Sequence, residues 1–174
     1  FGVTAGAAAF ADYNSDGYDD FALTGLNRNN QTIAYILTNS INRFEVKNGL
    51  VLQGVFFGKP AWGDYDSDGD LDILAADQSN PGNHVVAWYE NDGAVNPSFN
   101  RTNIATHPTA GGDRIFVGDL EGDGDLDIII TGHQDQGKVK WLKNDGAANP
   151  SFSVETIYGP ASGNDLDITR GRSY

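Results

Sequence analysis

Short runs of alternating apolar and polar residues recur along the chain, and they are rich in β-branched and aromatic side chains. In the central part of the sequence they cover residues 59–64, 71–76, 84–90 and 99–106, separated by DG, NDGA and NPS turn signals. No segment shows the 3.6-residue period that is typical of an amphipathic helix. The pattern therefore predicts an all-β fold of short antiparallel strands.

The same pattern returns three times. The segments AFADYNSDGYDDFALTG at 9–25, AWGDYDSDGDLDILAAD at 61–77 and FVGDLEGDGDLDIIITG at 116–132 align without a gap. A second repeated block starts at Val86 and again at Val139, with a weaker first copy from Ile33. Four strands in about 50 residues is typical of one blade of a β-propeller.

The repeats divide the chain into a single β-propeller region, residues 1–174, with units at about 5–57, 58–110 and 111–158 and a partial fourth unit at 159–174. In the fourth unit, GPASGNDLDITRG resembles KPAWGDYDSDGDLDIL with part of the acidic loop missing. The prediction is three full four-stranded blades and a fragment of another. Because Asn164, Asp165 and Asp167 lack the residues that lead the other loops, a fourth metal site is not expected.

Each full repeat contains one acidic loop with the spacing D-x-[DNE]-x-D-G-x-x-D. Oxygen-bearing side chains at positions 1, 3 and 5 alternate in a tight loop, and the glycine at position 6 permits a sharp reversal. Position 7 offers its backbone carbonyl and position 9 closes the shell, which predicts an all-oxygen Ca²⁺ site in each loop and about three Ca²⁺ ions in total. The predicted ligands are Asp12, Asn14, Asp16, Tyr18 and Asp20 in the first loop, Asp64, Asp66, Asp68, Asp70 and Asp72 in the second, and Asp119, Glu121, Asp123, Asp125 and Asp127 in the third.

The alternative is that these segments are ordinary turns rich in Asp and Gly, but three aligned copies favour metal binding. An EF-hand is excluded because its twelfth position needs a bidentate Glu, whereas Leu23, Ala75 and Ile130 stand there.

The charge balance agrees with this interpretation. The chain carries a formal net charge of −13, and the predicted ligands together with Asp19 include 14 of its 24 Asp and Glu residues. Such acidity argues against nucleic acid or an anionic membrane as a partner. The absence of Cys excludes disulfides and thiolate metal sites, and no apolar run approaches the 18 residues of a membrane span.

These repeats resemble the FG-GAP or VCBS family, which includes the integrin α-subunit propellers, some lectins and accessory domains of polysaccharide-degrading enzymes. The resemblance covers about residues 5–158. It implies Ca²⁺ in the hairpin between the first two strands of each blade, which corresponds to the three acidic loops. Family propellers usually close with about seven blades, so the resemblance also implies either self-association, as a closed dimer or a filament, or a place in a larger propeller.

The sequence offers fewer candidate residues for binding an organic ligand than for binding a metal ion. Tyr35, Trp88 and Trp141 align at one position of the third strand. They fit either packing between blades or a sugar platform, and packing is preferred. A small ligand is expected on the rim opposite the metal loops or between blades, near the NDGA turns at 91–94 and 144–147. The NQT and NRT triplets at Asn30 and Asn100 leave N-glycosylation open.

No GxSxG, HExxH or P-loop pattern is present, and most acidic residues lie in the metal loops, so the chain is not expected to be an enzyme. The sequence thus predicts an extracellular, secreted or cell-surface Ca²⁺-binding propeller module for recognition, adhesion or self-assembly. The alternatives are a carbohydrate-binding lectin-like propeller, and an accessory propeller fragment of a larger secreted polysaccharide-degrading enzyme.

Overall fold

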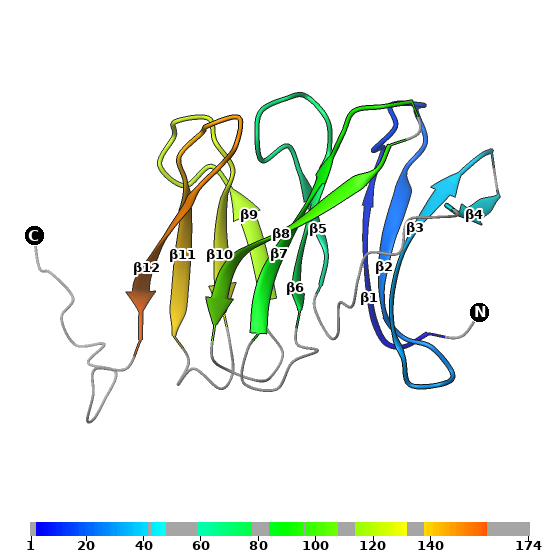
Figure 1. Cartoon of the computed structure of the whole chain (residues 1–174), viewed down its shortest axis with the longest axis horizontal. Helices are drawn as coiled ribbons and strands as arrows, with labels where there is room; N and C mark the ends of the chain where they lie inside the picture. The colour runs from blue at the N-terminus through cyan, green and yellow to red at the C-terminus, as the bar shows by residue number, and fades with distance from the viewer. Residues whose placement is uncertain are drawn as a thin grey trace, which may run out of the picture.

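The computed structural model describes residues 3–41, 43–47, 59–77, 84–95, 97–107, 114–131 and 138–159. Across these ranges the structure is all-β: twelve strands form three four-stranded antiparallel sheets, with no helix (Figure 1). This confirms the predicted all-β class. Within the same ranges, no helix is long and apolar enough to cross a membrane.

Each sheet is a meander in which every strand pairs with the next strand along the chain. Sheet 1 contains β1 (Thr4–Ala11), β2 (Asp20–Leu26), β3 (Thr32–Asn39) and β4 (Phe44–Val46). Sheet 2 contains β5 (Ala61–Gly63), β6 (Asp72–Asp77), β7 (His84–Asn91) and β8 (Phe99–His107). Sheet 3 contains β9 (Arg114–Gly118), β10 (Asp127–Thr131), β11 (Val139–Asn144) and β12 (Phe152–Tyr158). The four strands predicted for the central repeat are all present.

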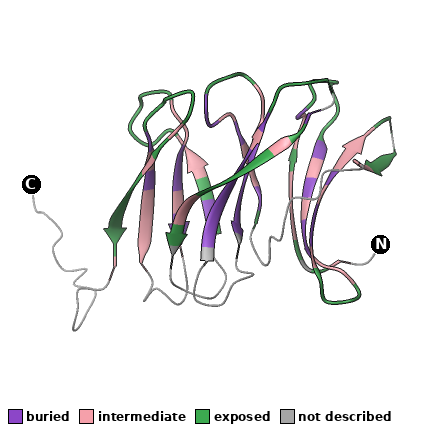
Figure 2. Cartoon of the chain, in the orientation of Figure 1, coloured by how far each residue is buried: buried purple, intermediate pink, exposed green. Residues whose placement is uncertain are grey.

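The three sheets stand side by side with sheet 2 in the middle (Figure 1). Side chains alternate between the two faces of a strand, so sheet 2 buries one face against sheet 1 and the other against sheet 3. Figure 2 shows that buried residues are frequent in the strands of this middle sheet and that exposed residues dominate the loops. Within the described part of the chain the sheets form an open row, and no closed ring is present.

Two apolar cores hold the row together. The core between sheets 1 and 2 contains Tyr13, Ala22, Ala34, Ile36, Ile73, Ala75, Ala87 and Tyr89, with Trp62, Leu71 and Phe99 packed against it. The core between sheets 2 and 3 contains Tyr65, Leu74, Ala76, Val86, Trp88, Ile115, Ile128, Ile130 and Leu142. Aromatic side chains make up much of this contact, since each buries a large apolar area.

The meander places two kinds of turn at one end of every sheet. Successive hairpin connections alternate between the two ends, so the first and third connections of each sheet lie at the same end (Figure 1). The first connections are the acidic loops, and the third connections of sheets 2 and 3 are the NDGA turns. The expectation that the NDGA turns lie on the rim opposite the metal loops is therefore wrong.

The partial fourth repeat, predicted at 159–174, lies outside the described residues except for Gly159. The repeat boundaries stay a prediction.

Candidate metal-binding loops

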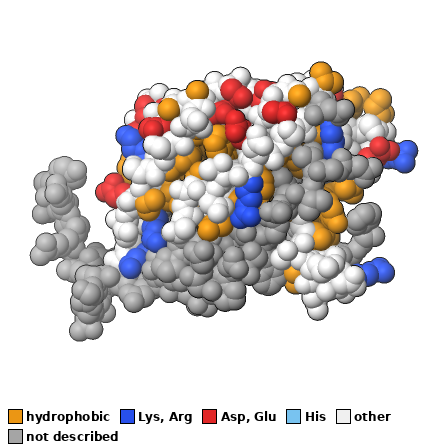
Figure 3. All heavy atoms as spheres, in the orientation of Figure 1, with side chains coloured by type: hydrophobic (Ala, Val, Ile, Leu, Met, Phe, Trp, Pro, Cys, Tyr) orange, Lys and Arg blue, Asp and Glu red, His pale blue; other side chains and the backbone are white. Residues whose placement is uncertain are grey.

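The three acidic loops each join the first two strands of a sheet, and all three lie at the same end of the row. They connect β1 to β2, β5 to β6 and β9 to β10. In the space-filling view, Asp and Glu side chains gather along this edge of the molecule (Figure 3).

Each loop is closed by its first aspartate. Both carboxylate oxygens of this residue accept hydrogen bonds from the backbone amides of positions 5 and 6. The donor–acceptor distances are 2.9 and 2.8 Å for Asp12 with Asp16 and Gly17, 3.1 and 3.1 Å for Asp64 with Asp68 and Gly69, and 3.2 and 3.0 Å for Asp119 with Asp123 and Gly124. The repeated spacing thus specifies a repeated three-dimensional loop.

The glycine at position 6 is required by its backbone conformation, and not because a larger side chain would collide with a neighbour. Gly17, Gly69 and Gly124 have φ angles of 89°, 96° and 97°, a region that L-residues rarely adopt. A Cβ at any of the three would meet no atom within 4 Å. The next amide then donates to the carboxylate at position 5, for instance from Asp70 to Asp68 at 2.9 Å.

The second loop brings three carboxylates together. Oxygen atoms of Asp64, Asp66 and Asp68 all lie within 4.8 Å of one another. Burial raises the pKa of Asp66, and the charges of Asp68 and Asp64 raise it further, although a backbone hydrogen bond lowers it. Two carboxylates 4 Å apart repel by about 4 kcal/mol at an effective dielectric of 20. A cation would remove this repulsion, and carboxylate oxygens are the donors that Ca²⁺ prefers.

The first loop offers a different mark of a cation site. The Asp20 side chain is fully buried, and its Oδ2 atom has no hydrogen-bond partner. Burial raises the pKa of this carboxyl, and the nearby charges of Asp16 and Asp12 raise it further. An unpartnered buried oxygen beside two other carboxylates fits a hard divalent cation.

The third loop is in contact with a positively charged side chain from a neighbouring strand. Glu121, at the third position, forms an ion pair with Lys143 of β11. Its hydrogen bond raises the pKa of Lys143. The predicted ligand Glu121 is thus held by an ammonium group, which distinguishes this loop from the other two.

The aspartate at position 9 ties each acidic hairpin to the third strand. Its Oδ1 atom accepts the backbone amide of the last residue of that strand: Asn39 donates to Asp20 at 2.6 Å, Asn91 to Asp72 at 2.8 Å and Asn144 to Asp127 at 2.8 Å. The asparagine side chains in turn donate to the carbonyls of Asp19, Leu71 and Leu126, the residues at position 8. Sequence analysis did not single out these asparagines, although each recurs at the same place before its turn.

Asp72 makes the most extensive set of these contacts. In addition to the Asn91 amide, its carboxylate accepts the Trp88 indole N–H at 2.9 Å and the Tyr65 backbone amide at 3.3 Å. Burial raises its pKa to about 7, although the hydrogen bonds from Asn91 and Trp88 lower it. The ninth position therefore organises the sheet, and its role as a Ca²⁺ ligand stays a prediction.

The acidic hairpins of sheets 2 and 3 lie within a segment that a family model recognises. Residues 64–130 match the FG-GAP-like repeat. The match confirms the resemblance inferred from the sequence over this segment, which runs from the second acidic loop into β10. No curated protein and no solved structure matches the chain.

Within the FG-GAP-like segment, the tryptophan of the third strand belongs to the core. Trp88 is 2% exposed and pairs with Leu74 across the sheet, which supports packing over a sugar platform at this position. Trp141 pairs with Ile129 in the equivalent register. In sheet 1 the equivalent pair is Ile36 with Ala22, so the expected equivalence of Tyr35 with the tryptophans is wrong by one residue.

At position 7 of the acidic loops, sheets 2 and 3 differ from sheet 1. A Cβ at Gly93 would collide with the Asp70 carboxylate, and one at Gly146 would collide with that of Asp125. In sheet 1 the corresponding residues are Tyr18 and Ile41. Sheets 2 and 3 thus share a close carboxylate–glycine contact that sheet 1 lacks.

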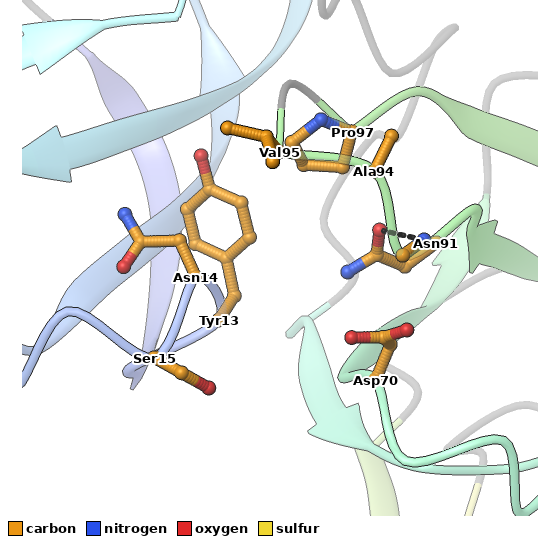
Figure 4. A pocket seen from close by; sticks show the side chains of 9 residues that line it. Tyr13, Asn14, Ser15, Asp70, Asn91, Ala94, Val95 and Pro97 are labelled. Carbon is orange, nitrogen blue, oxygen red and sulfur yellow. Dashed lines mark hydrogen bonds between the residues drawn. The ribbon is translucent and has the colours of Figure 1, made fainter.

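A pocket of about 290 Å³ opens between sheets 1 and 2 at the end of the acidic loops. One wall is the first acidic loop, with Tyr13, Asn14 and Ser15, and the other is formed by Asp70 and the β7–β8 turn (Figure 4). The turn residues in this wall are Asn91, Gly93, Ala94, Val95 and Pro97. The pocket combines a carboxylate and amides with a small apolar surface.

Proposed function

We propose that the chain is a Ca²⁺-stabilised β-propeller-type module that acts outside the cell in recognition or assembly, and that it is not an enzyme. The observation that carries the proposal is the convergence of Asp64, Asp66 and Asp68 in a loop whose hydrogen-bonded form occurs three times. The FG-GAP-like match over residues 64–130 supports the propeller-type arrangement.

Ca²⁺ suits these loops better than Mg²⁺ does. The loops offer carboxylate, amide and backbone carbonyl oxygens at irregular spacing, whereas Mg²⁺ demands a near-ideal octahedron and retains its waters. The ligand set in shallow loops favours the affinity range of extracellular modules, about 10⁻⁴ to 10⁻³ M. A chain with a formal charge of −13 also gains from the positive charge of the bound ions.

The test is a Ca²⁺ titration followed by calorimetry and by thermal unfolding. A ligand that binds only the native state stabilises it by about 2.7 kcal/mol when its free concentration is 100 times the Kd. We expect Asp68→Ala to remove one binding site and to leave the others, whereas Glu155→Gln, on the exposed strand β12, removes a carboxylate and leaves Ca²⁺ binding unchanged. A melting temperature that does not respond to excess chelator would overturn the proposal.

The pocket between sheets 1 and 2 favours a second candidate function, the binding of a small polar ligand such as a carbohydrate. Sugars are bound by carboxylate and amide groups beside a small apolar surface, and Asp70, Asn14 and Tyr13 supply these groups here. Ala94→Trp would fill the pocket, and Ala147→Trp at the equivalent turn of sheet 3 is the matched control. A glycan array that shows binding lost in the first variant and retained in the second supports this function. Retained binding in both variants places the ligand elsewhere.

A further inference from the structure

The outer face of sheet 1 exposes an aromatic cluster. Phe10 and Phe44 are 65% and 49% exposed, and the Phe21 ring lies between them, with ring centroids 5.4 Å from Phe10 and 5.1 Å from Phe44. A sheet normally buries its apolar face against another layer. This face has none among the described residues.

The cluster repeats a surface that the other two sheets use for packing. Phe10 pairs with Phe21 across the sheet as Trp62 pairs with Ile73 and Val117 with Ile128. Phe44 stands opposite Asn39 as Phe99 stands opposite Asn91 and Phe152 opposite Asn144. In sheets 2 and 3 the apolar residues of these pairs belong to the core shared with the preceding sheet. The outer face of sheet 1 is therefore the face that would receive a preceding sheet.

The core between sheets 1 and 2 shows which residue of a preceding sheet packs on this kind of face. Tyr13, the second residue of the first acidic loop, stacks on Trp62 with centroids 5.6 Å apart and lies 6.2 Å from the ring of Phe99. Tyr65 occupies the equivalent place in the second core and is 1% exposed. A loop residue of one sheet thus inserts among the aromatic residues of the next.

Sheet 3 carries the complementary surface. Leu120, the residue equivalent to Tyr13 and Tyr65, is 51% exposed, and Phe116 of β9 is 54% exposed. Trp141, the counterpart of the buried Trp88, has an indole N–H that is buried without a hydrogen-bond partner. The outer face of sheet 3 is therefore the face that would pack against a following sheet.

We propose that two copies of this chain associate head to tail, with the outer face of sheet 3 of one copy packed on the outer face of sheet 1 of the other. Leu120 then takes the place of Tyr13, against Phe10 and Phe44 of the second copy. The inference rests on the assembly role proposed above and names the surfaces that perform it. Because the two surfaces differ, the contact is heterologous, and repeated contacts close a ring or extend a filament.

A complementation experiment distinguishes this arrangement from a symmetric one. Phe10→Glu and Phe116→Glu place a charge on one outer face each, at exposed positions that tolerate the change in the isolated fold. Light scattering with Ca²⁺ at micromolar concentration should show wild type above 18.6 kDa and each variant alone at 18.6 kDa. An equimolar mixture of the two variants should form dimers, because each supplies the face that the other lacks. Val95→Glu, a fully exposed residue away from both faces, should associate as wild type does.

Head-to-tail association is overturned by a monomeric wild type, by a variant that still associates alone, or by a mixture that stays monomeric. Circular dichroism and thermal melts establish that each variant is folded. Ca²⁺ binding is measured on the same samples, so the two proposals fail separately. A monomer that binds Ca²⁺ refutes the contact alone, and an oligomer that is indifferent to chelator refutes the Ca²⁺ proposal alone.

Discussion

The ninth residue of each acidic loop links the hairpin to the third strand of its sheet, and it is also a predicted Ca²⁺ ligand. A buried carboxylate is costly unless its oxygens are hydrogen-bonded or bound to a cation. Asp72 meets this requirement with three protein donors, whereas Asp20 leaves one oxygen without a partner. The same residue type thus serves as a structural link in every sheet and keeps an open oxygen in the first.

Residue spacing was sufficient to find the loops, because ligand positions in a tight turn are fixed by local geometry. It did not reveal Asn91 and its equivalents, whose partners in the acidic hairpin lie between 17 and 20 residues away along the chain. The misplaced equivalence of Tyr35 has a similar origin. Strand register depends on pairing between strands, and a shift of one residue moves a side chain to the other face.

A testable consequence at this scale concerns the two NDGA turns. The Ser98 hydroxyl donates to Asp92 at 2.5 Å, and this hydrogen bond, with those from the Ala94 and Ser98 amides, lowers the pKa of the carboxyl from 3.8. The contribution to stability is therefore present above pH 3.8 and is lost as the pH falls through the lower folded value. We expect Ser98→Ala to raise the Asp92 pKa toward 3.8, measured by NMR titration of the carboxyl carbon.

Ser151→Ala provides the internal control, because Ser151 and Asp145 make the same contact in sheet 3. It should raise the pKa of Asp145 and leave that of Asp92 unchanged. A Ser98→Ala variant whose Asp92 titration matches wild type would show that the hydroxyl does not hold the carboxylate.

At the scale of the element, alternation and turn signals located the strands well. The run predicted at 71–76 is β6 at Asp72–Asp77, and that at 99–106 is β8 at Phe99–His107. The turn signals did not predict which turns lie at the same end of a sheet, because that depends on the number of connections between them. Short strands such as β5, with three residues, also shift the predicted ends.

The third acidic hairpin differs from the others through β11, and this gives a prediction about relative affinity. Lys143 holds Glu121, whereas the equivalent residue of sheet 1 is Thr38. We expect Lys143→Thr to release Glu121 and to strengthen Ca²⁺ binding at the third loop about threefold, since exposed ion pairs contribute up to about 1 kcal/mol. Isothermal titration calorimetry would show the change as a lower Kd for the weakest of the Ca²⁺ sites.

Lys140→Thr removes a positive charge from the same strand farther from the loop, and it controls for the change in net charge. Equal effects of the two substitutions would mean that long-range charge, and not the contact with Glu121, limits the third site.

At the scale of the whole molecule, the three sheets and two cores formed by the described residues follow from one repeated unit. The repeat predicted four strands per unit and the core position of Trp88, but it did not single out the buried Tyr13, Tyr65 and Tyr89. It could not predict how many sheets close a ring, because each sheet contacts only its neighbours. Among the described residues the row therefore ends in two unlike faces, and equivalent residues meet different environments in the middle and at the ends.

Equivalent residues of the second and third acidic loops allow this difference to be measured. Tyr65 is buried between sheets 2 and 3, and Tyr65→Ala should destabilise the chain by about 3 to 5 kcal/mol, the cost of removing a large buried side chain. Leu120 holds the same place beside the outer face of sheet 3, and Leu120→Ala should change the stability of the dilute monomer by less than about 0.5 kcal/mol. Urea unfolding at low protein concentration compares the two directly.

Because the buried Tyr65 hydroxyl has no hydrogen-bond partner, Tyr65→Phe should leave the free energy of unfolding unchanged or increase it. This variant separates the packing of the ring from the effect of its hydroxyl group. If Leu120→Ala were as damaging as Tyr65→Ala in the monomer, its side chain would be packed within a single chain, and the outer face of sheet 3 would not be free to receive a second copy.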